Sequence, residues 1–206
     1  MPPSGLAILL GAGPTTAAGI ARILAHPSHG NLAVALLSRT GDSSLASKIS
    51  TSSNGGTVKA FKTDTSEQQL KSAFSEIQSW SQSLDSDLKL KIAIFNIKHS
   101  HKVAFLEESA EKFNDSLSTY VTGAMVFSQL SLKWMLEQYP TQSDQPHLQK
   151  KGTIVFTGTL GSLRTNPGFA AYGAGRAGVR MLAQVRSSGH GSLPPNPPTN
   201  PQPPSP

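Results

Sequence analysis

The chain has 206 residues, enough for one domain with its own core, and no cysteine, which excludes disulfides, thiolate catalysis and cysteine-based metal sites. Lysine and arginine outnumber acidic residues by 18 to 12, a net charge of +6, but they are spread along the chain, so we expect no nucleic-acid binding. No apolar run is long enough to cross a membrane or serve as a secretory signal, so the sequence predicts a cytoplasmic protein without membrane contact.

Short apolar runs bounded by turn residues predict buried strands at 6–10, 32–37, 90–97 and 153–157. Apolar residues at helical spacing lie between these runs, namely Ile20, Ile23 and Leu24, then Leu70, Phe74 and Ile77, then Leu117, Val121, Ala124, Leu132 and Met135. Thr65 followed by Gln68 fits a capping box for the helix that carries Leu70. The stretch 43–58, rich in Ser, Thr and Gly, predicts a short helix with a loop.

This alternation of strands and helices predicts an α/β fold, a doubly wound, Rossmann-like parallel sheet between two helical layers. We expect one dinucleotide-binding domain at 1–188, with ligands at the carboxyl ends of the strands. The residues 189–206 are rich in proline and carry no formal charge, which predicts a disordered tail. A polyproline ligand for an SH3-type partner is the alternative for this tail.

A glycine-rich turn directly follows the first run and opens a helix, in the sequence Gly11-Ala12-Gly13-Pro14-Thr15-Thr16. Glycines let a backbone approach a phosphate closely, and a helix N-terminus offers free N–H groups. Gly11, Gly13 and Thr16 are therefore candidate contacts for the diphosphate of a dinucleotide. An ordinary tight turn between a strand and a helix has the same pattern.

The second run ends at Arg39, where dinucleotide folds meet the adenosine ribose. An acidic residue at this place accepts the ribose hydroxyls of NAD, whereas an arginine offers a planar fork of donors to the 2′-phosphate of NADP. Arg39 thus favours NADP as the cofactor. A plain surface arginine is the alternative.

Tyr172 and Arg176 are four residues apart, on one face of a helix, and Thr159 follows the fourth run. A phenol beside a fixed cation is a better acid–base catalyst, because the cation favours the phenolate. A hydroxyl at Thr159 can hydrogen-bond the reacting oxygen. By themselves, a tyrosine and an arginine at this spacing also fit surface packing.

In this order, and together with Asp64 and Asn96, these motifs resemble the short-chain dehydrogenase/reductase family over residues 6–186, and they look most like its fungal members. The resemblance implies that Asp64 contacts the adenine, Asn96 lines the cofactor cleft, and Tyr172 donates a proton to a carbonyl that receives hydride. It also implies a homo-oligomer, and fungal relatives often serve secondary metabolism.

The chain departs from the family pattern at several positions. Thr15 and Ala17 replace two glycines of the turn, and Tyr120 stands where a helix asparagine holds a water in the proton relay. Thr159 replaces a serine, and Arg176 replaces a lysine. The arginine keeps the positive charge but cannot pass a proton on. The family continues with further strands after residue 186, so we expect a C-terminally truncated sheet, with an exposed edge on the strand at 153–157.

The remaining candidates for chemistry are weaker. His99 and His101 have no third ligand nearby, so no metal site is expected. The acidic residues Glu107, Glu108 and Glu111 fit the solvent face of a helix.

The sequence as a whole predicts an NADP(H)-dependent oxidoreductase that transfers hydride between the nicotinamide and a carbonyl or alcohol substrate, with Tyr172, Thr159 and Arg176 as catalytic residues. The alternative is a truncated, non-catalytic relative that binds a nucleotide or a partner protein.

Overall fold

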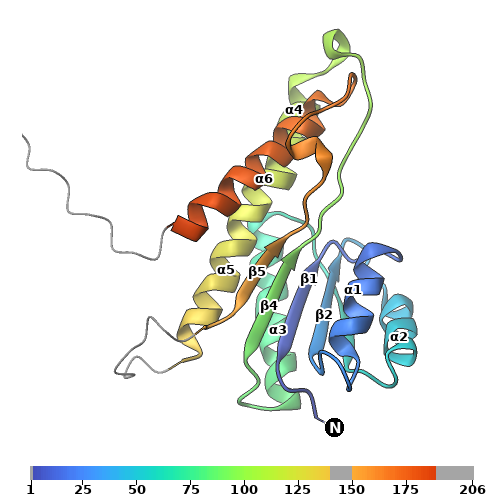
Figure 1. Ribbon diagram of the computed structural model, residues 1–206, viewed down its shortest axis with the longest axis vertical. Coiled ribbons are helices and arrows are strands. Elements are labelled where there is room, and N and C mark those ends of the chain that lie inside the picture. The colour runs from blue at the N-terminus through green and yellow to red at the C-terminus, as the bar shows by residue number, and fades with distance from the viewer. Residues whose placement is uncertain (1, 140–149, 189–206) are drawn as a thin grey trace, which may run out of the picture.

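The computed structural model describes residues 2–139 and 150–188, and its centre is a parallel sheet of five strands in the order β3-β2-β1-β4-β5 (Figure 1). The strands are β1 (Leu6–Leu10), β2 (Ala33–Ser38), β3 (Val58–Lys62), β4 (Leu90–Phe95) and β5 (Thr153–Phe156). The main helices are α1 (Thr16–Ala25), α2 (Ser43–Ser52), α3 (Glu67–Leu84), α4 (Ala110–Leu117), α5 (Gly123–Glu137) and α6 (Ala170–Ser188). The expected doubly wound α/β fold is confirmed, and the expected tail at 189–206 lies outside the described residues.

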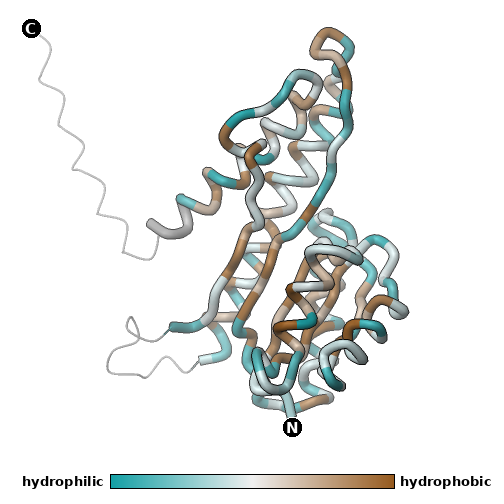
Figure 2. Tube along the Cα trace, turned by 45° about the vertical axis from the view of Figure 1, so that its right-hand side comes forward, coloured by the Kyte–Doolittle hydropathy of each residue, from teal (hydrophilic) through white to brown (hydrophobic). Residues whose placement is uncertain are grey.

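Two apolar cores lie on the two faces of the sheet, because successive side chains of a strand point to opposite faces. Leu6, Ile8 and Leu10 of β1 pack against α3 and α5, and Ala7 and Leu9 pack against α1 and α2. The whole of β1 is buried, as the continuous apolar run predicted. Figure 2 shows the apolar strands running through the centre of the fold, between the helices.

The strand β3 was missed in the sequence, which predicted only a short helix with a loop over 43–58. The helix is present as α2, but Val58 already begins a strand that pairs with β2. β3 is an edge strand, and its sequence VKAFK places lysines on exposed positions, so only Phe61 is fully buried. With two lysines among five residues, this strand lacks the largely apolar run by which the others were recognised.

The start of α3 also differs from the prediction. The helix begins at Glu67 with Ser66 as its N-cap, and no side chain caps it, so the capping box of Thr65 and Gln68 is wrong. Instead, Asp64 binds Ser66: the Oδ1 of Asp64 accepts hydrogen bonds from the N–H of Ser66 at 2.8 Å and from the hydroxyl of Ser66 at 2.6 Å. An Asx turn has replaced the capping box.

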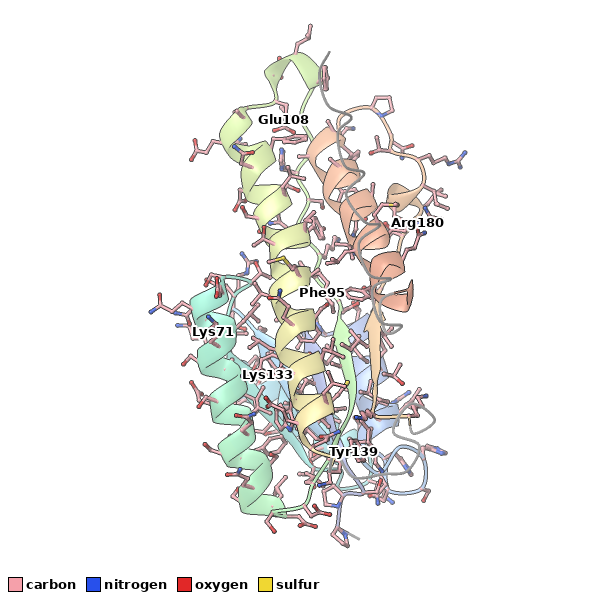
Figure 3. The ribbon with its side chains drawn as sticks, turned by 90° about the vertical axis from the view of Figure 1, so that its left-hand side faces the viewer. Lys71, Phe95, Glu108, Lys133, Tyr139 and Arg180 are labelled. Atoms are coloured by element: carbon pink, nitrogen blue, oxygen red, sulfur yellow. The ribbon has the colours of Figure 1, made fainter. Side chains whose placement is uncertain are left out.

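The predicted helix through Leu117 and Met135 consists of α4 and α5 joined by a π-helical turn, η2 (Ser118–Thr122). Figure 3 shows α4 and α5 in line as one long rod beside α6, with Glu108 near its upper end and Phe95 beside α5. A π-turn widens a helix locally and is frequent at functional sites. Here it places Tyr120, the largest fully buried side chain, toward α6.

Within the described residues, β5 pairs only with β4, and Val155 on it is 40% exposed, as expected for an uncovered edge. The outer side of α6 is also open, with Met181 55% exposed. The glycines inside α6 have a packing reason, because a Cβ at Gly175 would lie 2.6 Å from Tyr120 and one at Gly178 would lie 2.6 Å from Val121. They let α6 approach the π-turn closely.

Candidate active site

A cleft of about 1320 Å³ runs along the carboxyl ends of the strands. It lies where the strand order reverses, at β1, which is the place where open parallel sheets bind ligands. The volume exceeds that of most pockets for small ligands and suits an extended molecule. All predicted site residues line this cleft, namely Gly11, Gly13, Thr16, Arg39, Asp64, Asn96, Thr159, Tyr172 and Arg176.

The two glycines of the turn after β1 differ in their surroundings: Gly11 is packed against the protein, and Gly13 faces open space. Gly11 has φ +91°, and a Cβ there would lie 2.3 Å from the carbonyl oxygen of Asn96, so only glycine fits. At Gly13 a Cβ would meet nothing within 4 Å. The helix α1 that follows has Thr15 as its N-cap, and no side chain caps its first N–H groups. The turn therefore leaves space and free donors for an anionic group.

Arg39 is exposed at the end of β2, where the sequence analysis placed it. The nearest acid along the chain, Asp42, caps α2 by accepting from the N–H groups of Ser44 at 2.9 Å and Leu45 at 3.1 Å. The hydroxyl of Ser44, followed by the N–H of Leu45, lowers the pKa of Asp42. This carboxylate is therefore engaged in the helix cap.

The lining of the cleft is positively biased, because four lysine and arginine residues line it against three carboxylates. Its acidic residues are Asp64, held by Ser66, Glu67, paired with Lys71, and Asp115, paired with His99. In contrast, no ion pair within the described ranges involves the lining residues Arg39, Lys98 or Arg164. The cleft thus suits an anionic ligand.

Asn96 connects two neighbouring strand ends. Its Nδ2 donates to the carbonyl oxygen of Gly11 at 3.1 Å, and its backbone N–H donates to the carbonyl of Leu10 at 2.8 Å. Asn96 therefore holds the glycine turn against the end of β4.

The hydroxyl groups of Thr159 and Tyr172 meet at 2.8 Å. Thr159 is exposed just beyond β5, and Tyr172 is half-buried in the first turn of α6. The two residues are thirteen positions apart, and the structure brings them together as the sequence analysis expected. Since one hydroxyl donates to the other, the pair keeps one proton that it can donate to a ligand oxygen.

Arg176 lies one turn further along α6 and is only 5% exposed. Its Nη1 donates to the carbonyl of Thr157 and its Nη2 to the carbonyl of Ile97, both at 2.9 Å. Its guanidinium carbon is 4.8 Å from the ring centroid of Tyr120 and 5.6 Å from that of Tyr172. The arginine is therefore a fixed, buried cation beside the tyrosine pair, as its position four residues after Tyr172 predicted.

Two histidine–carboxylate pairs that the sequence did not predict lie between the segment after β4 and the start of the helical rod. His99 contacts Asp115 at 2.8 Å, and His101 contacts both oxygens of Glu108 at 2.9 Å. The side chain of Glu108 is 7% exposed, so its interpretation as part of a solvent face is wrong. Glu107 belongs to a short 3₁₀ turn rather than to a helix.

Over residues 2–139 and 150–188, no group of three or more His, Asp or Glu side chains lies close enough to hold a metal ion. Nor does a helix in these ranges have the length and apolar character that crossing a membrane requires.

Comparison with known proteins gives a family match over most of the chain. The family described as short chain dehydrogenase matches residues 6–190. A short-chain dehydrogenase from Rhodopseudomonas palustris is similar with 26% identity and a TM-score of 0.72, over 91% of this chain and 79% of that one. Comparison with curated proteins finds no significant match.

More distant solved structures share the fold. A short-chain type dehydrogenase/reductase from Mycobacterium marinum has 23% identity and a TM-score of 0.71, over 90% of this chain and 67% of that one. An alcohol dehydrogenase from the archaeon Thermococcus sibiricus, complexed with 5-hydroxy-NADP, has 17% identity and a TM-score of 0.71, over 89% and 70%.

Proposed function

Because the chain belongs to the short-chain dehydrogenase family, whose members are oxidoreductases that use a nicotinamide cofactor, we propose that it is an NADP(H)-dependent enzyme that transfers hydride between the nicotinamide and a carbonyl or alcohol carbon. One observation carries this proposal: the hydroxyls of Thr159 and Tyr172 meet at 2.8 Å in a cleft of about 1320 Å³. Two hydroxyls that converge on one point are suited to a single substrate oxygen.

The residues of the cleft fit a dinucleotide. The open space at Gly13 and the uncapped start of α1 at Thr16 suit its diphosphate, and Asp64 and Asn96 line the path on either side of the turn. When bound, the nicotinamide supplies or accepts the hydride. The choice of NADP over NAD rests on Arg39, a donor fork at the end of β2 that forms no ion pair within the described ranges, while Asp42 is engaged in capping α2.

In carbonyl reduction, Tyr172 donates the proton that the developing alkoxide requires. The hydroxyl of Thr159 lies 2.8 Å from that of Tyr172, and by donating to the phenol oxygen it leaves the phenol proton free for the substrate oxygen. Arg176 supplies a fixed positive charge 5.6 Å from the phenol ring, which favours negative charge there as the proton leaves. The guanidinium itself keeps its proton.

We further propose that the described domain acts on a small carbonyl or alcohol compound and forms homo-oligomers. The cytoplasm is the proposed compartment, because a chain of 206 residues without cysteine suits a reducing environment.

Titration of the chain with NADPH, followed by nucleotide fluorescence, tests the cofactor part of the proposal. A matched variant, Gly13→Val, adds its side chain from a position where a Cβ meets nothing within 4 Å. We expect the wild type to bind NADPH and Gly13→Val to bind at least about tenfold more weakly, with an unchanged melting temperature. A folded wild-type chain that does not bind NADPH would refute the proposal.

Tyr172→Phe tests the chemical part. The variant keeps the ring but removes the acidic proton, so we expect NADPH binding to persist and turnover to fall by about 10²- to 10⁴-fold. If turnover is retained, Tyr172 is not the proton donor. If the wild type binds NADPH but converts no carbonyl substrate, the alternative of a non-catalytic nucleotide binder is correct.

A further inference from the structure

Tyr120 is fully buried in the π-turn between α4 and α5, and the proposed chemistry does not use it. Its hydroxyl accepts the backbone N–H of His99 at 2.7 Å. On the other side, α6 passes so closely that a Cβ at Gly175 would lie 2.6 Å from the ring. The ring is thus held between the segment after β4 and the helix that carries Tyr172.

The guanidinium of Arg176 lies in the corner between two aromatic rings. The rings of Tyr120 and Tyr172 are 6.0 Å apart and inclined by 76°, and the guanidinium carbon is 4.8 Å and 5.6 Å from their centroids. Both distances are within the range of cation–π attraction. No carboxylate pairs with Arg176 in the described ranges, and its buried Nε has no hydrogen-bond partner there.

The same guanidinium extends the sheet beyond its last backbone hydrogen bond. The N–H of Thr157 donates to the carbonyl of Phe95 at 3.0 Å, and the next two carbonyls, of Ile97 and Thr157, are bound by Arg176. Arg176 therefore joins the ends of β4 and β5 to α6. Thr159 follows Thr157 by two residues, and Tyr172 precedes Arg176 by one turn of α6. The contact of Arg176 with Thr157 therefore sets the distance between the hydroxyls of Thr159 and Tyr172.

A buried cation without a carboxylate partner needs other groups to hold it, because its desolvation is not repaid by an ion pair. Two carbonyls and two ring faces are the groups present. Tyr172 is half-buried at the cleft, whereas Tyr120 is fully enclosed, so Tyr120 is the rigid one of the two rings. Burial also raises the pKa of Tyr120, opposed by the His99 N–H and the Arg176 charge, which leaves its hydroxyl protonated at neutral pH.

We propose that Tyr120 is a positioning residue: the face of its ring holds the Arg176 guanidinium across the ends of β4 and β5, and thereby keeps the hydroxyls of Thr159 and Tyr172 in contact. The hydroxyl of Tyr120 also holds the segment after β4, by accepting the N–H of His99 at 2.7 Å. This inference rests on the proposed role of Tyr172 in proton transfer.

The variants Tyr120→Phe and Tyr120→Leu separate the ring from the hydroxyl. Phenylalanine keeps the aromatic face, whereas leucine fills much of the space without it. We expect Tyr120→Phe to keep kcat within about threefold, and Tyr120→Leu to lower kcat by about 10- to 100-fold, because small misplacements of catalytic groups have effects of this size. The affinity for NADPH stays unchanged in both. Phe127→Leu, a matched change at another fully buried aromatic residue of the same core, lowers stability without this loss of kcat.

A second readout is independent of activity. In ¹⁵N-arginine NMR spectra, a guanidinium held by two carbonyls and a ring rotates slowly and gives separate Nη–H signals, and Arg176→Lys identifies the signals of Arg176. We expect these signals to stay separate in the wild type and Tyr120→Phe and to merge in Tyr120→Leu. If they remain separate in Tyr120→Leu, or if Tyr120→Phe loses as much kcat as Tyr120→Leu, the positioning role of the ring is refuted. If the wild type shows no turnover but the signals merge only in Tyr120→Leu, the proposed function is refuted and the positioning role of the ring is not.

Discussion

Because α6 lies so close to Tyr120, we expect the change from glycine to alanine to lower the stability of the fold at Gly175 and to raise it at Gly19. Gly175 and Gly19 both lie inside helices, so replacing either by alanine favours the helix. A Cβ at Gly175 would lie 2.6 Å from Cδ2 of Tyr120, a distance at which something has to move, whereas a Cβ at Gly19 meets nothing within 4 Å. Tyr120 is 0% exposed, and its hydroxyl is held by the His99 N–H at 2.7 Å, so its ring has no room to move.

The size of each effect follows from two terms. The change from glycine to alanine in a helix contributes about 1 kcal/mol of stability, and Gly19→Ala keeps all of it. Forcing a methyl group into a packed interior costs about 1–3 kcal/mol, so Gly175→Ala loses up to about 2 kcal/mol net. For a domain of this size, 1 kcal/mol corresponds to about 2–4 °C in melting temperature.

Urea unfolding followed by circular dichroism measures both variants, with the thermal midpoint as a second observable. We expect Gly19→Ala to be more stable than the wild type and Gly175→Ala to be less stable, with a difference of at least about 1 kcal/mol between the variants. Equal stabilisation by both changes would mean that α6 does not contact Tyr120 as described, and that the ring of Tyr120 does not hold the Arg176 guanidinium.

Three further predictions concern the rest of the site. Arg39→Glu weakens NADPH binding by at least about tenfold relative to NADH, and equal affinities for both nucleotides in the wild type would contradict the role of Arg39. Thr159→Val lowers kcat by about 10²-fold with NADPH binding unchanged, whereas Thr159→Ser retains the rate. Asp42→Ala lowers the melting temperature at neutral pH, while Asp42→Asn retains much of the cap. Because the folded-state pKa of Asp42 is lowered, its contribution to stability is complete above the ordinary carboxyl pKa and disappears as the pH falls through the lowered value. The melting temperatures of the wild type and Asp42→Ala therefore converge in acid.

The central strands could be predicted because β1 and nearly all of β2 are unbroken apolar runs, and only Lys91 interrupts the run of β4. Leu6–Leu10 has the predicted bounds, and β4 and β5 begin where predicted. β3 could not be found in this way, because an edge strand is buried on fewer positions and its lysines break the run. The start of α3 was misplaced because the side chain of Asp64 binds Ser66, an interaction between neighbouring residues that competes with the capping box.

The residues of the cleft could be predicted because parallel strands present their carboxyl ends at one edge of the sheet, so residues that follow different strands converge. Gly13, Arg39, Asn96 and Tyr172 all lie there. The contact between Tyr120 and Arg176 was not predicted, because it depends on the π-turn that places Tyr120 toward α6, and the spacing of apolar residues does not mark such a turn. Gly175, next to Arg176, is the sequence signal that could have indicated a close approach in α6, but it was not interpreted in that way.

The most direct test of the proposed activity is deuterium transfer from NADPH labelled at C4 of the nicotinamide to a panel of aldehydes and ketones, with mass spectrometry of the alcohols formed. We expect the wild type to place deuterium on the carbinol carbon of at least one product, and Tyr172→Phe to bind the nucleotide without forming labelled product. A wild-type chain that binds NADPH and transfers deuterium to none of the carbonyl compounds, or a Tyr172→Phe variant that transfers it at the wild-type rate, would contradict the account.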